Sequence, residues 1–99
     1  MNTREQKIFV RNLKKLMQDY DLYQYELADM LGINRSVLNE TLNQKNVPTL
    51  HFVYAISGQF KTLSLDWLLK GEGEQWKGRA PKILKGAPKT APRVAQLKT

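Results

Sequence analysis

Polar side chains able to donate and accept hydrogen bonds gather in one short segment after residue 33. Its members are Asn34, Arg35, Ser36, Asn39, Glu40 and Asn43. On a helix, side chains three and four residues apart share a face, so these residues would form one polar surface. Such a surface has two interpretations, as a solvated side of the helix and as a side that contacts a partner.

The sequence lacks the residues needed for covalent or metal chemistry. It has no cysteine, which excludes disulfides, thiolate zinc sites and a cysteine nucleophile. The single histidine, His51, lies near the start of a predicted helix, where a surface or capping role is commoner than metal ligation. Gly71 and Gly73 follow a predicted helix and indicate a helix stop, not a phosphate-binding loop. We therefore expect neither an enzyme nor a bound cofactor or metal.

Two helices are predicted directly around the polar segment. Gly32 can take the left-handed conformation that ends helices, so one helix is expected over residues 24–31. Asn34 is a favourable N-cap for the next helix, expected over residues 35–42. The polar segment thus begins at the amino end of its helix.

Three further helices are predicted from capping residues and apolar periodicity. Thr3 and Gln6 have the spacing of a capping box, and apolar residues at helical steps continue this first helix to about Tyr20. Thr49 is the expected cap of a fourth helix and Ser64 of a short fifth helix. The expected fold is all-α, a compact five-helix domain.

The net charge of +7 is carried by the end of the chain. Residues 77–99 hold seven Lys and Arg and no Asp or Glu, which leaves nine cations and nine acids in residues 1–76. Residues 77–99 are rich in Gly, Pro, Ala and Lys, a composition that buries too little apolar surface to offset ordering entropy. We predict a domain over 1–76 and a disordered basic tail over 77–99.

No part of the sequence indicates a membrane segment. No run approaches the roughly 20 apolar residues of a membrane span, and the first residues lack the cationic and apolar regions of an export signal. We expect a soluble, cytoplasmic protein.

The segment 24–43 has the pattern of two short helices joined by a tight turn. Ala28 would lie where the helices cross and Gly32 at the turn, while Leu27, Leu31, Ile33 and Leu38 would face inward. A helix-turn-helix unit is therefore expected over residues 24–43.

The chain resembles the lambda-repressor and Cro type of helix-turn-helix regulators, the XRE family, over about residues 8–74. The resemblance is strongest in residues 24–33, QYELADMLGI, and 64–73, SLDWLLKGEG. It implies a compact lambda-repressor-like DNA-binding domain in which helix 35–42 enters the major groove of double-stranded DNA.

The resemblance also implies a role for individual residues. Arg35, Ser36 and Glu40 match positions that meet bases in the family, and Val37 is a further candidate. Arg35 could bond guanine O6 and N7 together, Glu40 could accept from cytosine N4, and Val37 could touch a thymine methyl or be partly buried. The residues expected at phosphates are Gln24, Asn34, Asn39, Asn43 and Lys45.

The sequence departs from the family at several positions. A buried Arg and Glu that often pair in the family correspond to Met17 and Leu42, so both partners of the ion pair are replaced by apolar residues. Gln44 stands where glycine is common after the recognition helix, and Tyr23 replaces a small hydroxyl cap. The spacing of Tyr20, Tyr23, Tyr25 and Tyr54 is interpreted as helix packing.

The leading hypothesis is a bacterial or phage transcriptional repressor that binds a palindromic operator as a homodimer. The alternative is a protein-binding module, such as an antitoxin-like partner that uses the basic tail to bind another protein. The tail has two further interpretations, as a set of phosphate contacts beside the domain and as a solubilising extension.

Overall fold

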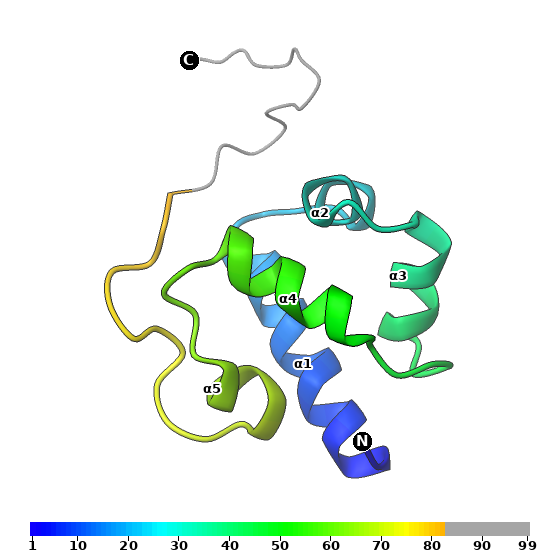
Figure 1. Cartoon of the computed structure of the whole chain (residues 1–99), viewed down its shortest axis with the longest axis horizontal. Helices are drawn as coiled ribbons and strands as arrows, with labels where there is room; N and C mark the ends of the chain where they lie inside the picture. The colour runs from blue at the N-terminus through cyan, green and yellow to red at the C-terminus, as the bar shows by residue number, and fades with distance from the viewer. Residues whose placement is uncertain (83–99) are drawn as a thin grey trace.

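Five helices joined by short loops make up residues 1–82, the part of the chain that this computed structural model describes (Figure 1). They are α1 (Thr3–Asp19), α2 (Gln24–Leu31), α3 (Arg35–Leu42), α4 (Leu50–Gln59) and α5 (Leu65–Lys70). The predicted all-α fold is confirmed, and residues 1–82 contain no extended strand. Residues 83–99, most of the predicted tail, lie outside the described residues.

The first helix is capped by a different pair of residues from the one predicted. The Asn2 side chain accepts from the Glu5 amide at 2.9 Å, and the Glu5 carboxylate accepts from the Asn2 amide at 2.8 Å. The prediction of Thr3 and Gln6 was wrong because both pairs have the same spacing. Asn is a stronger cap than Thr, and a carboxylate in the first turn also suits the helix dipole.

The core is formed by apolar side chains from all five helices and from the loop before α5. Its fully buried members include Phe9, Leu13, Leu16, Leu27, Leu38, Phe52, Ile56, Phe60, Leu63 and Leu68. Phe9 and Phe52 meet edge to face at 5.9 Å. Met17 packs against this core and Leu42 is only 4% exposed, so the apolar residues at these two positions are accommodated without a buried charge.

A buried hydrogen bond joins α1 to α5. Asn12 is 4% exposed, and its Nδ2 donates to the Trp67 carbonyl at 2.7 Å. Because a buried amide without a partner is costly, this bond fixes how the two helices lie against each other.

Trp76 folds back onto the domain, an outcome the sequence left open. It forms an isolated antiparallel bridge with Leu63, and its ring meets that of Tyr20 edge on at 6.2 Å. Tyr20 also packs against Phe60. Tyr20, Phe60 and Trp76 thus form one aromatic cluster beside the end of α1.

Residues 77–82, assigned from the sequence to the tail, hydrogen bond to the domain. The Lys77 amide donates to the Thr62 carbonyl, and the Thr62 hydroxyl donates to the Arg79 carbonyl, both at 2.7 Å. The Tyr20 hydroxyl donates to the Pro81 carbonyl. Burial, with a smaller contribution from the charge of Asp19, raises the pKa of Tyr20 and keeps this donor protonated. We call residues 76–82 the C-terminal strap.

Within residues 1–82, no helix has the length and hydropathy to cross a membrane. The same residues include no cluster of three or more His, Asp or Glu side chains placed to hold a metal ion. His51 lies exposed on the first turn of α4.

Candidate nucleic-acid interface

The predicted helix-turn-helix unit is formed by α2 and α3, which lie together at one side of the molecule (Figure 1). Ala28 is fully buried, as expected for a small residue where helices cross. Gly32 has φ 66°, and its amide and that of Ile33 donate back to carbonyls of the last turn of α2. A Cβ at Gly32 would meet nothing within 4 Å, so this position requires glycine for its backbone conformation and not for space.

The helix α3 has one buried and one exposed side. Leu38, Thr41 and Leu42 are at most 4% exposed and face the core. The exposed residues are Asn34, Arg35, Ser36, Val37, Asn39, Glu40 and Asn43. Val37 is 39% exposed, so its methyl groups are open to contact. The polar side of α3 is thus exposed at the surface of the domain.

Arg35, the first residue of α3, is held by two residues of α2. Its Nε and Nη2 donate to Asp29, with the shortest contact 2.9 Å from Nη2 to Oδ2. Its guanidinium also lies 5.4 Å from the centre of the Tyr25 ring. The Tyr25 ring in turn stacks on Tyr23 at 5.9 Å and 10°. Arg35 is therefore exposed and yet oriented.

Asn34 and Ser36 form the amino-terminal cap of α3. The Oδ1 of Asn34 accepts from the Ser36 amide at 2.8 Å and also from the Ser36 hydroxyl. Asn34 was predicted as this cap, and both hydrogen bonds are accepted by its side-chain oxygen Oδ1. The Nδ2 group of Asn34 carries the donors that a phosphate contact would need.

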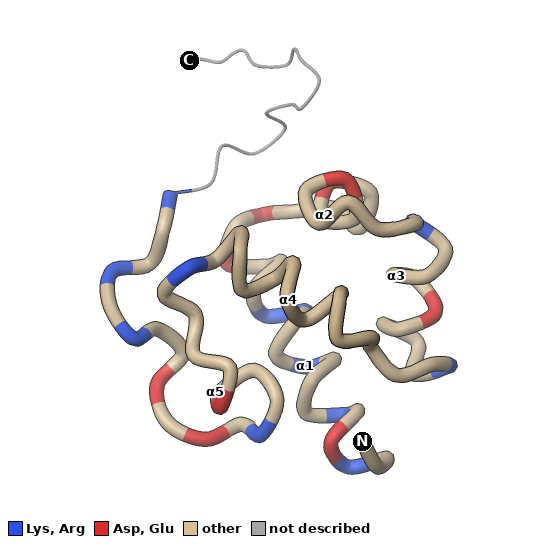
Figure 2. The backbone as a smooth tube through the Cα atoms, viewed as in Figure 1, with Lys and Arg blue, Asp and Glu red and all other residues tan. Residues whose placement is uncertain are grey.

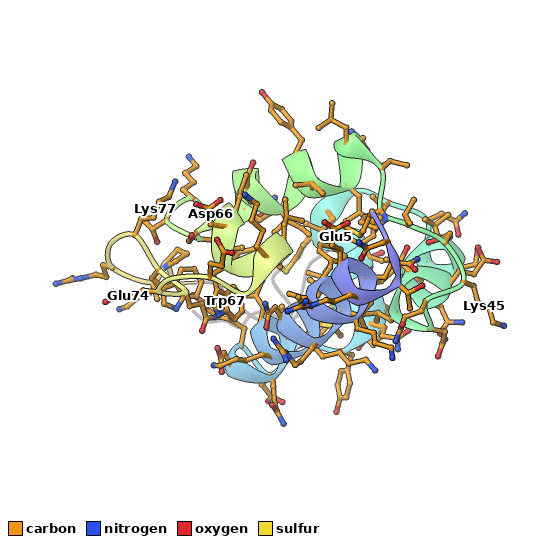
Figure 3. All side chains as sticks on the ribbon, turned by 90° about the horizontal axis from the view of Figure 1, so that it is seen from below. Glu5, Lys45, Asp66, Trp67, Glu74 and Lys77 are labelled. Carbon is orange, nitrogen blue, oxygen red and sulfur yellow. The ribbon has the colours of Figure 1, made fainter. Side chains whose placement is uncertain are left out.

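The end of α3 forms the expected reversal although glycine is absent. Gln44 has φ 61°, and its amide donates to the Thr41 backbone carbonyl at 3.0 Å. The Lys45 amide donates to the Glu40 backbone carbonyl at 2.9 Å. This is the Schellman arrangement, here with a strained glutamine in the left-handed position. Asn43, the C-cap residue, donates from its side chain to the Asn39 carbonyl at 2.8 Å. Lys45 points outward at the α3 end of the molecule (Figure 3).

A hydrogen-bond network supports the loop that follows α3. Asn46 accepts at Oδ1 from the buried hydroxyl of Thr41, and its Nδ2 donates to Glu40 at 3.3 Å. Gln6 of α1 donates to the Asn46 carbonyl at 3.4 Å. Glu40 is exposed and in contact with Asn46, so any contact it makes with a base competes with that bond.

Gln24 is the first residue of α2 and is exposed, beside the amide groups of that helix terminus. The preceding residue, Tyr23, occupies the N-cap position. Its amide donates to Glu26 at 2.8 Å, and Glu26 is 5% exposed. A carboxylate three residues on thus satisfies the backbone at this terminus in place of the small hydroxyl residue common in the family.

Charge is unevenly distributed over the domain (Figure 2). The exposed side of α1 carries Arg4, Lys7, Arg11, Lys14 and Lys15. The α2–α3 side carries Arg35 and Lys45, with Asp29 and Glu40 nearby. The α3 surface therefore differs from the α1 surface in the arrangement of its polar groups and not in an excess of positive charge.

Two residues of the site were not identified from the sequence. Asp29 and Tyr25 lie one turn apart on α2, and both contact Arg35. Nothing in the sequence singled out Asp29, and Tyr25 was interpreted as a packing residue. The packing interpretation holds for Tyr20 but was wrong for Tyr23, Tyr25 and Tyr54, which are 61%, 44% and 75% exposed. The tight turn at Gly32 could have indicated these contacts, because it brings the last turn of α2 close to the first residue of α3.

Comparison with known protein families gives one match. A helix-turn-helix family model, HTH_3, matches residues 13–68, which include all of α2, α3 and α4. No curated protein and no solved structure matches the chain.

Proposed function

The chain belongs to the XRE family of lambda-repressor/Cro-type helix-turn-helix DNA-binding regulators, and on that premise we propose that it recognises one specific double-stranded operator. In the proposed complex, α3 enters the major groove and α2 crosses the sugar-phosphate backbone. By occupying its operator, the protein represses transcription.

The observation that supports this proposal most strongly is the exposed polar side of α3. The guanidinium of Arg35 and the hydroxyl of Ser36 lie in its first turn, and the amide of Asn39 and the carboxylate of Glu40 lie one turn further on. These groups are the donors and acceptors that match base edges in the major groove.

Base contacts are assigned to Arg35, Ser36, Val37 and Glu40. Arg35 bonds guanine O6 and N7, and Ser36 bonds a neighbouring base. Glu40 accepts from cytosine N4, and Val37 packs on a thymine methyl. The exposure of all four side chains supports this assignment.

Phosphate contacts are assigned to the residues around these base contacts. They are Gln24, Asn34, Asn39, Asn43 and Lys45. Gln24 lies at a helix amino terminus, where the backbone amides and the helix dipole both favour an anion. These contacts fix the position of α3 on the duplex without specifying the sequence.

The proposed active form is a homodimer. Two copies of α3 about 34 Å apart would enter successive major grooves on one side of the duplex. The operator is then expected to be palindromic, with half-sites separated by one helical turn.

In vitro selection of bound duplexes from a random pool tests the proposal directly. Recovery of a palindromic consensus with a guanine in each half-site is the expected result. Recovery of no preferred duplex, with binding equal for all sequences, would refute operator recognition. A single non-repeated consensus would retain recognition and refute the dimer.

A further inference from the structure

The guanidinium of Arg35 is restrained on one edge and on one face before any DNA is present. Asp29 accepts hydrogen bonds from Nε and Nη2, and the Tyr25 ring lies 5.4 Å from the guanidinium carbon. The Arg35 side chain remains 64% exposed. It is therefore held in place without being covered.

The two restraints leave one hydrogen-bonding edge of the guanidinium available. A guanidinium has five N–H groups, one on Nε and two on each Nη. Asp29 engages the Nε edge, which leaves the edge formed by Nη1 and the second N–H of Nη2. Two parallel N–H groups on one edge suffice for guanine O6 and N7.

The neighbouring rings add a second restraint on orientation. A guanidinium that lies on a ring face loses freedom to rotate about its long side chain. Tyr25 is itself stacked on Tyr23, so the ring beneath Arg35 is supported. An arginine that is already oriented loses less conformational entropy when it binds a base.

We propose that Asp29 and Tyr25 are specificity-determining residues, which position Arg35 so that its Nη1 and Nη2 edge reads one guanine of the operator. This inference rests on the proposed function. Asp29 has a second effect, because a carboxylate close to the duplex repels phosphates and lowers affinity for every sequence. The residue thus sharpens preference at a cost in overall binding.

Two other roles of the ion pair predict different results. If Asp29 only stabilised the α2–α3 unit, its loss would lower the melting temperature and weaken all duplexes alike. If Asp29 competed with guanine for Arg35, its loss would increase the preference for the selected duplex. Both results would contradict a positioning role.

The test uses the full chain with Asp29→Asn, measured against the selected duplex and a scrambled duplex of equal composition. The ratio of the two affinities is expected to fall by about three- to tenfold. Affinity for the scrambled duplex is expected to rise slightly, because one negative charge is lost. Repeating the selection should show relaxed preference at the Arg35 guanine alone.

Matched variants separate positioning from general effects of charge and folding. Glu72→Gln removes one exposed negative charge far along the sequence and should leave the affinity ratio unchanged. Tyr25→Leu should lower the ratio, whereas Tyr25→Phe, which keeps the ring, should not. Adding Asp29→Asn to Arg35→Ala should lower the ratio no further.

The outcomes distinguish this inference from the proposed function. If the unmodified chain prefers no duplex, operator recognition fails. If it selects a consensus and Asp29→Asn retains the full guanine preference with an unchanged melting curve, recognition stands and the positioning role is refuted.

Discussion

The exposed sides of α1 and α3 differ in how many cations they carry and in how those cations are held. The α1 side carries five exposed cations, and an ion pair on it, Lys15 with Asp19, lies along the helix at a four-residue spacing. The α3 side carries fewer cations, but its arginine is oriented by residues of another helix. In Figure 3, α1 runs from the middle of the view toward its lower left, whereas α3 lies at the right-hand end beside Lys45. Net charge alone would favour the α1 surface as the DNA site, whereas the proposed site on α3 is favoured by the orientation of its donors.

Removing one arginine from each surface should give the largest difference between them. Arg35→Ala should weaken binding to the selected duplex by about 1–3 kcal/mol, because a bidentate base contact is lost. Arg11→Ala, an exposed position on α1, should leave sequence preference unchanged. Fluorescence anisotropy with selected and scrambled duplexes measures both variants.

Equal losses in the two variants would show that charge and not orientation governs binding. A loss in Arg35→Ala that is the same for both duplexes would reassign Arg35 to a phosphate.

The helices α1 and α3 also end alike, with a residue other than glycine at positive φ. Gln44→Gly should raise the free energy of unfolding by about 0.5–1 kcal/mol, since the left-handed strain of glutamine exceeds the entropy cost of glycine. Asp21→Gly, at φ 54° after α1, should gain less because aspartate tolerates this conformation better. Urea denaturation of the two variants gives the comparison, and destabilisation by Gln44→Gly would contradict it.

Lysines on the two surfaces should differ in their effect on salt dependence. Lys45→Ala should reduce the slope of log affinity against log salt by about 0.9, the value for one lost phosphate contact. Lys14→Ala, on α1, should leave that slope unchanged. Titrations over a range of salt concentrations measure this effect, and a reduced slope in Lys14→Ala would place DNA against α1 as well.

Features set by neighbouring residues could be predicted from the sequence. The end of α2 and the start of α3 follow from Gly32 and Asn34, whose conformational and capping preferences act within one turn of the chain. The exposed and buried sides of α3 follow from the spacing of Leu38 and Leu42. Residue type and local spacing sufficed for these features.

Features set by contacts between elements could not be predicted. Asp29 and Tyr25 meet Arg35 only because the turn at Gly32 brings two helices together, and their types are equally common on solvated surfaces. The return of Trp76 to Leu63 depends on a pairing across the whole of α5. The prediction of the α1 cap was wrong for another reason, because Thr3 with Gln6 and Asn2 with Glu5 have the same spacing.

The two ends of α1 differ in what lies beside them, which has a practical consequence for labelling. Gln6 bonds to Asn46, next to Lys45, so a fluorophore or fusion attached at the amino terminus would crowd the loop after α3. The C-terminal strap instead ends beside Tyr20, at the other end of α1, about 25 Å away for a helix of this length. A probe at the Tyr20 end of α1 would therefore lie farther from the proposed DNA-binding surface than a probe at the amino terminus.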